Sequence, residues 1–239
     1  EPHMLPVYEK VIHRMRCWKA MQEQALLQTA QPLLAWYPLH ARDLPWRHTQ
    51  EPYRIWLSEI MLQQTRVEAV KNYYARFLET FPDIAALAAA EQDQVNKCWE
   101  GLGYYSRAAN LRKAAQMIQE QYGGVFPRTW EEVRGLAGVG DYTAGAVCSI
   151  CYGLPTPAVD GNVLRVAARV MNHFCEIDRP EQKADVTALL RQVYLDNPEH
   201  CGTLTQAFME IGATVCVPNG QPHCEACPLS ELCLGRQYC

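Results

Sequence analysis

Apolar residues recur at intervals of three and four along almost the whole chain of 239 residues. Val163, Val166 and Val170 illustrate this spacing, which places apolar side chains along one side of a helix. Segments in which apolar and polar residues alternate strictly, as they do in strands, are nearly absent. The sequence therefore predicts an all-α protein. Helices are predicted over Glu9–Ala35, Pro52–Phe77, Ile84–Ala90, Gln92–Trp99, Ser106–Tyr122, Trp130–Ala137, Tyr142–Tyr152, Asn162–Phe174, Gln182–Leu195 and Cys201–Val215.

The composition predicts a folded and soluble protein. Hydrophobic residues make up 49% of the chain and charged residues 20%. This balance allows a buried core and excludes a disordered or collagen-like chain. No stretch approaches the roughly 18 to 20 consecutive apolar residues that a membrane-spanning helix requires. We therefore expect an intracellular protein without a membrane partner. The formal net charge of −4 gives no overall basic character, so a nucleic-acid partner has to be inferred from local features.

Four cysteines lie close together near the C-terminal end of the chain. Cys216, Cys224, Cys227 and Cys233 are separated by seven, two and five residues, in a segment that also contains proline and glycine. Four thiolates at this spacing fit one metal site, and both zinc and an iron–sulfur cluster accept such ligands. The spacing does not distinguish the two, and four unrelated free thiols are the alternative. We expect a structural site that fixes the C-terminal segment to the rest of the protein.

Two glycines separate the predicted helices Trp130–Ala137 and Tyr142–Tyr152. Gly138 and Gly140 allow a tight turn whose backbone amides point outward at the start of the second helix, where the helix dipole attracts an anion. The segment 130–150 is therefore a candidate helix-hairpin-helix motif that binds DNA phosphates. The alternative is an ordinary connection between two helices.

Two carboxylates occur in contrasting surroundings. Glu59 lies in the strongly apolar segment Ile55–Leu62, where burial disfavours the charged form and leaves a proton to donate. The alternative is a surface glutamate or one paired with Arg54. Asp160 precedes the helix that starts at Asn162, where a simple N-cap is expected and where the helix terminus favours an ionised carboxylate. A proton donor together with a retained anion is the arrangement that glycosidic-bond cleavage needs.

Two further segments have the features of DNA-contacting loops. Residues 97–113 hold four bases and one acid, interleaved with aromatics and glycines. Together these offer phosphate attraction and a surface for stacking or wedging. The alternative is a solvated helix start with buried tyrosines. A pair of glutamines one helical turn after Glu59 presents amides that can reach base edges. The residues predicted to contact DNA in these segments are Gln63, Gln64, Thr65, Gly103, Tyr104, Tyr105, Ser106 and Arg107.

Taken together and in this order, the motifs resemble the MutY family of adenine DNA glycosylases, within the helix-hairpin-helix superfamily that includes endonuclease III. The resemblance extends from about Leu44 to Cys233. It rests on Leu57–Thr65, Gly101–Arg107, Gly138–Gly140, Val159–Val163 and the four clustered cysteines.

The resemblance implies two helical lobes with a DNA cleft between them. One lobe is a six-helix barrel over residues 45–157, and the other, over residues 1–44 and 158–239, holds a 4Fe-4S cluster. The implied partner is duplex DNA in which adenine is mispaired with 8-oxoguanine or guanine; the adenine is flipped out and cut at its N-glycosidic bond. A monomer in the cytoplasm of a prokaryote, associated with the nucleoid, is the corresponding expectation.

The resemblance also implies roles for single residues. Glu59 matches the acid that protonates adenine N7, and Asp160 matches the carboxylate that stabilises the cationic sugar. Tyr142 and Asn162 match polar residues that assist at the same centre, and Arg47 matches a base beside the pocket. The residues that fill or wedge the opened base stack are matched by Gln64 and by Tyr104 or Tyr105.

Bifunctional relatives carry a lysine at the position of Tyr142, whose amine forms a Schiff base and leads to strand cleavage. A tyrosine there predicts a monofunctional glycosylase. The sequence departs from the family in the seven-residue spacing after Cys216 and in Ala137 where proline is common. The additional C-terminal domain of the family does not follow Cys239, so either the sequence is truncated or the recognition of 8-oxoguanine is expected to depend on the loop Gly101–Arg107. The alternatives are a thymine or uracil mismatch glycosylase of the same superfamily and a catalytically silent DNA-binding module.

Overall fold

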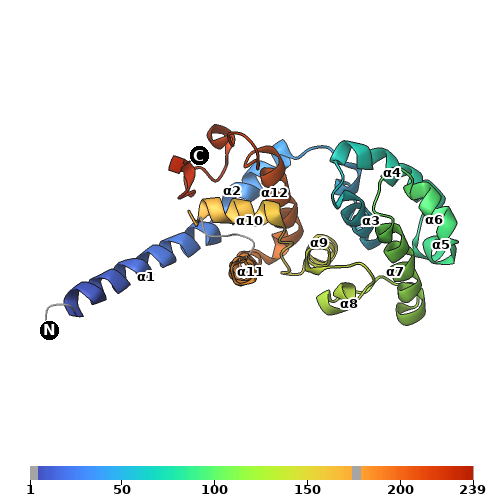
Figure 1. Ribbon diagram of the computed structural model, residues 1–239, viewed down its shortest axis with the longest axis horizontal. Helices are drawn as coiled ribbons and strands as arrows, with labels where there is room; N and C mark the ends of the chain where they lie inside the picture. The colour runs from blue at the N-terminus through green and yellow to red at the C-terminus, as the bar shows by residue number, and fades with distance from the viewer. Residues whose placement is uncertain (1–4, 174–178, 239) are drawn as a thin grey trace. The chain divides into compact units, whose positions relative to one another are not determined.

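The computed structural model describes residues 5–173 and 179–238, and within these ranges it contains helices and loops but no strand, which confirms the predicted all-α class. The chain divides into two compact units (Figure 1). The terminal unit comprises Glu1–Ala41 with Val159–Cys239, and the central unit comprises Arg42–Ala158. The predicted six-helix barrel, cluster lobe and DNA cleft stay predictions.

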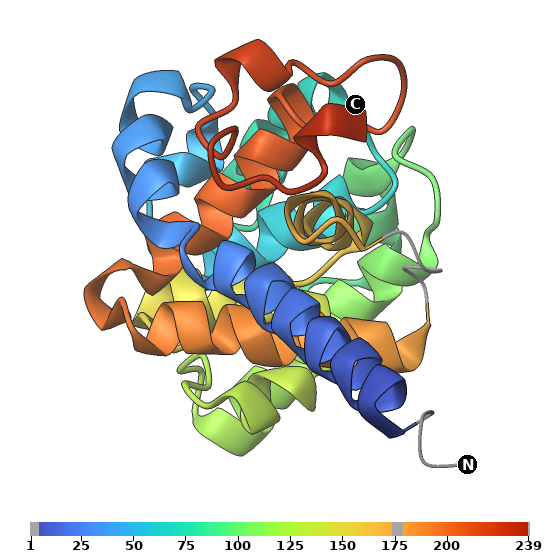
Figure 2. The ribbon, with the colours of Figure 1, turned by 90° about the vertical axis from the view of Figure 1, so that its left-hand side faces the viewer.

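The terminal unit is built around a core to which both ends of the chain contribute. α12 packs against α2 and α10, and α1 packs against α11 (Figure 2). Leu26, Leu33 and Phe208 are among its fully buried side chains. Its elements are α1 (Leu5–Leu27), α2 (Ala30–His40), α10 (Gly161–Val170), α11 (Pro180–Leu195), η2 (Pro198–His200), α12 (Cys201–Thr214), η3 (Cys224–Ala226) and η4 (Arg236–Tyr238).

The central unit is organised around α3, which packs against α4, α7 and α9. Large aromatic side chains fill its interior. Trp56 and Phe126 meet edge to face at 5.7 Å between ring centroids, and Phe77 and Trp99 meet in the same way at 6.0 Å. Edge-to-face contact is one of the favoured arrangements of aromatic pairs. Its elements are η1 (Pro45–Arg47), α3 (Pro52–Leu62), α4 (Val67–Thr80), α5 (Ile84–Ala89), α6 (Gln92–Trp99), α7 (Ser106–Tyr122), α8 (Trp130–Arg134) and α9 (Asp141–Tyr152).

The single helix predicted over Glu9–Ala35 is wrong, because α1 ends at Leu27 and α2 begins at Ala30. Pro32 explains the break: proline has no backbone N–H, and its ring clashes with the carbonyl four residues earlier in a continuous helix. The Thr29 hydroxyl donates instead to the carbonyl of Leu26 at 2.7 Å, inside the core.

The continuous helix predicted over Pro52–Phe77 is also wrong. α3 ends at Leu62 and α4 begins at Val67. Gln64 has a φ of 56°, in the left-handed region, and therefore cannot continue a right-handed helix. Neither glycine nor proline occurs at this break, so local sequence gave no sign of it.

The other helix predictions hold to within a few residues. α6 and α7 begin and end where the sequence predicts. α8 is shorter than expected and ends at Arg134, before the glycine turn. α10 ends at Val170, and its predicted end, Phe174, lies outside the described residues. Among the described helices, none combines the length and apolar character required to cross a membrane.

Candidate functional site

The Glu59 side chain is only 6% exposed, in a run of α3 that is buried from Ile55 to Met61. Pro52 starts the helix at its first position, where a missing N–H costs nothing. α3 packs against α9, and Glu59 lies close enough to Cys151 of α9 to influence it: burial, Cys148 and Glu59 together raise the pKa of the Cys151 thiol to about 12. The structure thus excludes a surface position for Glu59.

Arg54 is not the counter-ion of Glu59. Its Nε donates to Oε2 of Glu51 at 2.7 Å, and the two side chains are 44% and 49% exposed. The buried placement of Glu59 therefore agrees with the sequence argument for a desolvated carboxyl group, while its role as an acid remains a prediction.

Asp160 caps the N-terminus of α10. Its Oδ1 accepts from the backbone N–H of Val163 at 2.8 Å, and its Oδ2 accepts from Nδ2 of Asn162 at 3.0 Å. Both carboxylate oxygens are thus held by donors at a helix terminus, an environment that stabilises negative charge. The N-cap interpretation is confirmed, and the same geometry keeps the carboxylate orientation fixed.

A chain of polar contacts connects Asp160 with the cysteine segment. Asn162 accepts at Oδ1 from Nη2 of Arg165 at 3.1 Å, and the same Nη2 donates to the carbonyl of Gly212 at 2.7 Å. Nε of Arg165 donates to the carbonyl of Cys216 at 3.0 Å. Sequence reasoning missed this arginine. The sequence did contain an indication of its role. Arg165 and Arg169 lie one turn apart on a mostly apolar helix, so their side chains share one face of that helix.

The four clustered cysteines line one small cavity of about 30 Å³ in the terminal unit. Burial raises the pKa of Cys227 to about 11, with contributions from the other three thiols, so all four lie near one another. Nη1 of Arg169 donates to Sγ of Cys216 at 3.2 Å and to the carbonyl of Val217 at 2.9 Å.

Across residues 5–173 and 179–238, no group of three or more His, Cys, Asp or Glu side chains is arranged as metal ligands. The donor set nevertheless fits a metal centre, because four thiols surround one cavity. Four cysteines are the usual ligands of an iron–sulfur cluster and of structural zinc.

The last residues run against α10. The backbone N–H groups of Leu234 and Gly235 donate to the carbonyls of Val170 and Arg169 at 2.9 and 3.0 Å. A Cβ at position 235 would collide with the carbonyl oxygen of Arg169, so glycine is required by the close approach.

The helix-hairpin-helix prediction matches the local geometry. Gly138 has a φ of 75°, and a Cβ there would lie 2.7 Å from Cβ of Asn110. Gly140 is the N-cap of α9 and faces open space. Arg134 stabilises the turn by donating to the carbonyl of Val139 at 2.9 Å and pairing with Asp141 at 2.5 Å. Tyr142 follows in the first turn of α9 and is half-buried.

The loops after α3 and before α7 both present exposed polar or aromatic side chains. Gln64 and Tyr104 have φ values of 56° and 49°. Such values are rare for residues other than glycine. Gly103, directly before Tyr104 in the loop that precedes α7, has a φ of 72°, which glycine adopts without steric cost. Tyr104, Tyr105 and Ser106 are exposed, whereas Gln63, Thr65 and Gly103 are half-buried.

The structure places Arg107 differently from the prediction that it contacts DNA. The residue is 8% exposed, and its terminal nitrogens donate to backbone carbonyls of the protein. The basic side chain faces inward because it is attracted to the carbonyl oxygens at the end of α3, which lack helical partners.

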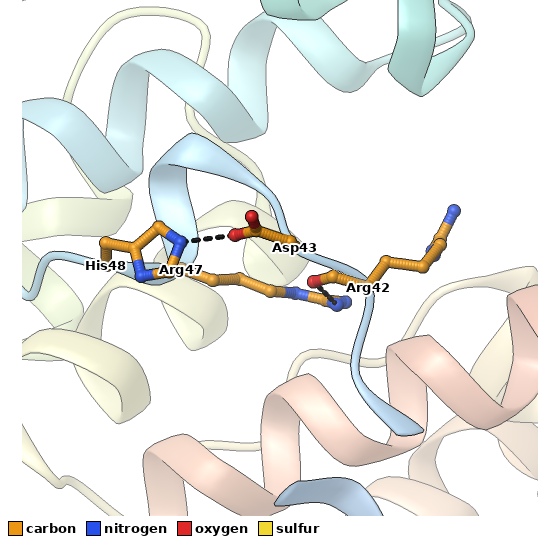
Figure 3. Close-up of polar contacts among 4 residues, drawn as sticks. All are labelled: Arg42, Asp43, Arg47 and His48. Carbon is orange, nitrogen blue, oxygen red and sulfur yellow. Dashed lines mark hydrogen bonds and ion pairs between the residues drawn. The ribbon is translucent and has the colours of Figure 1, made fainter. Parts of the chain in front are cut away.

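Arg47, expected beside the pocket, is the last residue of η1, which precedes α3. Its Nη1 donates to the carbonyl of Arg42 at 3.0 Å, and Asp43 pairs with His48 at 2.5 Å (Figure 3). Figure 3 also shows the Arg42 side chain pointing away from the other three. The backbone contact fixes the Arg47 guanidinium in place, half-buried.

The HhH-GPD superfamily base excision DNA repair protein profile matches residues 57–192. The match covers more than half of the 239 residues, so the chain belongs to the HhH-GPD superfamily.

Among curated relatives, the chain is 44% identical to the adenine DNA glycosylase of Homo sapiens over an alignment of 214 residues, and the match covers 86% of this chain and 39% of that protein. It is 36% identical to the adenine DNA glycosylase of Buchnera aphidicola subsp. Baizongia pistaciae, with 85% of this chain and 57% of that protein covered. The chain therefore spans between about two fifths and three fifths of these relatives. A thermostable thymine-DNA glycosylase superposes with a TM-score of 0.77 and 26% identity, covering 91% of this chain and 98% of that one.

Proposed function

We propose that this chain carries the activity of a monofunctional adenine DNA glycosylase, which removes adenine mispaired with 8-oxoguanine or guanine. The observation that carries this proposal is the buried carboxyl group of Glu59, 6% exposed, in the same unit as the helix-hairpin-helix segment. The adenine DNA glycosylases among its relatives support adenine as the base.

In the proposed mechanism Glu59 donates a proton to N7 of the flipped adenine. The C1′–N9 bond breaks, its electron pair stays with the base, and adenine leaves as a neutral molecule. Asp160 stabilises the positive charge that develops on the sugar, and its orientation is set by Asn162 and by the N-terminus of α10. Water then adds to C1′ and loses a proton, which leaves an abasic sugar.

Tyr142 determines the class of product. A lysine amine at this position would attack C1′ and form an imine, whereas a tyrosine hydroxyl cannot form one. The proposed enzyme therefore leaves the DNA backbone intact, and Tyr142 assists at the same centre through its hydroxyl group.

The proposed partner is duplex DNA. The amides around Gly138 and Gly140 would bind backbone phosphates, because they lie at the N-terminus of α9. Gln64 and Tyr104 project from the two loops and would contact the opened base stack. A monomer is the proposed state, and the cytoplasm, where a prokaryotic nucleoid lies, is the proposed place of action.

The proposed cofactor is a 4Fe-4S cluster held by Cys216, Cys224, Cys227 and Cys233. Its function would be to cross-link the C-terminal segment, because these residues follow α12 and precede the contacts of Leu234 and Gly235 with α10. The cluster would supply ligand bonds that hold this segment folded.

A panel of duplexes tests the proposal. Each duplex carries A, T, G or U opposite guanine or 8-oxoguanine, and products are scored before and after alkali. We expect cleavage after alkali only, and only with adenine. Release of thymine or uracil instead would support the alternative that the similarity to a thymine-DNA glycosylase favours. Tight binding with no base release would support the silent binding module.

A further inference from the structure

One guanidinium joins two loops that are far apart in the sequence. Nη1 of Arg107 donates to the carbonyls of Ile60, Met61 and Gln63 at 2.9, 3.1 and 2.6 Å. Nη2 donates to the carbonyls of Leu102 and Gly103 at 3.1 and 3.2 Å and approaches Oγ1 of Thr65 at 3.4 Å. These acceptors belong to the last turn of α3 with the segment that follows it, and to the segment before α7.

Arg107 is held in this position by its surroundings. Its guanidinium lies over the ring of Trp99 at 5.2 Å and that of Tyr104 at 5.7 Å. At such distances the negative face of an aromatic ring attracts a cation. Burial lowers the pKa of Arg107, and the backbone carbonyl oxygens compensate for the lost hydration. Within the described part of the chain, Nε is the one nitrogen of this guanidinium that makes no hydrogen bond.

Each of the two joined segments carries a residue in a rare backbone conformation. Gln64 and Tyr104, with φ values of 56° and 49°, are not glycines, and Tyr104 is exposed. Such conformations cost free energy and persist where surrounding contacts hold them. Trp99 adds one such contact, because its Nε1 donates to the carbonyl of Gly103 at 3.0 Å.

We propose that Arg107 is a positioning residue that holds Gln64 and Tyr104 as one rigid element for opening the DNA base stack. This inference rests on the proposed function. Lysine cannot replace Arg107, because a single ammonium group cannot reach carbonyls on both segments, whereas the planar guanidinium spreads its donors over both.

The test compares Arg107→Lys with Arg112→Lys. Arg112 is on the same helix and donates to one carbonyl, that of Ala90, at 2.5 Å, so the control removes a similar contact outside the two segments. Hydrogen exchange is measured without DNA. In Arg107→Lys we expect exchange to be at least about tenfold faster in residues 62–66 and also in residues 100–105, and unchanged in the control.

Function is measured on the same proteins. With 2-aminopurine opposite guanine, Arg107→Lys should give less fluorescence increase on binding, because fewer bases are unstacked. Single-turnover excision of adenine, measured well below the melting temperature of each protein, should fall about tenfold. If the wild-type protein releases no adenine, the proposed function fails, but the exchange and fluorescence measurements still decide the role of Arg107.

Faster exchange in only one segment, or in neither, would overturn the inference. So would unchanged base unstacking in a variant whose two segments both exchange faster. A change confined to the salt dependence of DNA binding would also overturn the inference, and it would support the prediction that Arg107 contacts a DNA phosphate. If Arg107→Lys does not fold, native-state hydrogen exchange of the wild-type protein tests the inference instead. If Arg107 joins the two segments, both should open with the same free energy, and two different opening free energies would overturn the inference.

Discussion

Asn162 donates a hydrogen bond from its side-chain amide to the carboxylate of Asp160 at 3.0 Å, while its oxygen accepts from Arg165 at 3.1 Å. The amide is therefore fixed at both ends. Neither the donor nor the acceptor of Asn162 can rotate without breaking a contact, so the direction of the Asp160 carboxylate depends on a residue two positions along the chain.

Removing the amide should impair catalysis more than binding. We expect Asn162→Ala to lower the single-turnover rate of adenine release about tenfold, because Asp160 loses one of its two donors. The rate is measured with saturating protein, and duplex affinity is measured separately. Asn96→Ala is the control, since Asn96 accepts a hydrogen bond from Gln92 on α6. An unchanged rate would show that Asp160 needs no support from Asn162.

Replacing the buried acid should abolish base release. Glu59→Gln keeps the size of the side chain but removes the proton donor, and a loss of roughly 100- to 10,000-fold is expected for a general acid. Gel-shift affinity for the mismatched duplex should change little. Glu68→Gln, which affects an exposed pair with Lys71 at 2.8 Å, should be as active as wild type. Full turnover by Glu59→Gln would remove Glu59 from the acid role.

A lysine in the first turn of α9 should introduce strand cleavage. Tyr142→Lys supplies an amine at the position where bifunctional relatives carry one, so some product should be nicked without alkali. Borohydride should trap a covalent protein–DNA adduct. Tyr122→Lys, at the end of α7, should give no adduct. Failure to trap an imine with Tyr142→Lys would count against the interpretation of this position.

Breaking the cysteine set should release the C-terminal segment. We expect purified wild-type protein to be brown, since iron–sulfur clusters absorb visible light and zinc does not. Cys227→Ser should lose the colour, and proteolysis within residues 216–238 should be at least about tenfold faster. Cys98→Ser, on α6, should retain both properties. A colourless wild-type protein that contains zinc would contradict the iron–sulfur cluster and show that the four cysteines bind zinc.

Stability should fall in alkaline solution. Burial raises the pKa values of the Cys148 and Cys151 thiols to about 12, from an ordinary value of 9.0. The neutral thiols therefore stabilise the fold fully below pH 9, and this contribution is lost as the pH rises from 9 toward 12. Urea unfolding at several pH values measures the decline. Cys148→Ala should make it shallower, and an identical slope would contradict the assignment.

The sequence predicted those parts of the molecule that local patterns determine. The bounds of α6 and α7, the glycine turn at Gly138 and the N-cap at Asp160 all follow from residues near one another in the chain. The burial of Glu59 also followed from its apolar neighbours, because α3 is buried from Ile55 to Met61.

The remaining features depend on contacts over long sequence separations. α3 ends where Arg107, 44 residues beyond Gln63, binds its last carbonyls, and no residue near the break signals this. The inward orientation of Arg107 was missed because a basic residue beside exposed tyrosines has the same pattern on a DNA-binding surface. Arg165 was missed because its acceptors, the carbonyls of Gly212 and Cys216, are far from it in the sequence and are brought to α10 only by folding.

Because Gly235 lies so close to Arg169, a missense change at position 235 should disturb the structure of the C-terminal segment, although glycine itself has no chemically reactive side chain. Even an added methyl would push the final residues off α10 and carry Cys233 with them. Gly235→Ala would then resemble loss of the proposed cluster more than damage to the proposed catalytic groups, and growing cells in excess iron would not correct it.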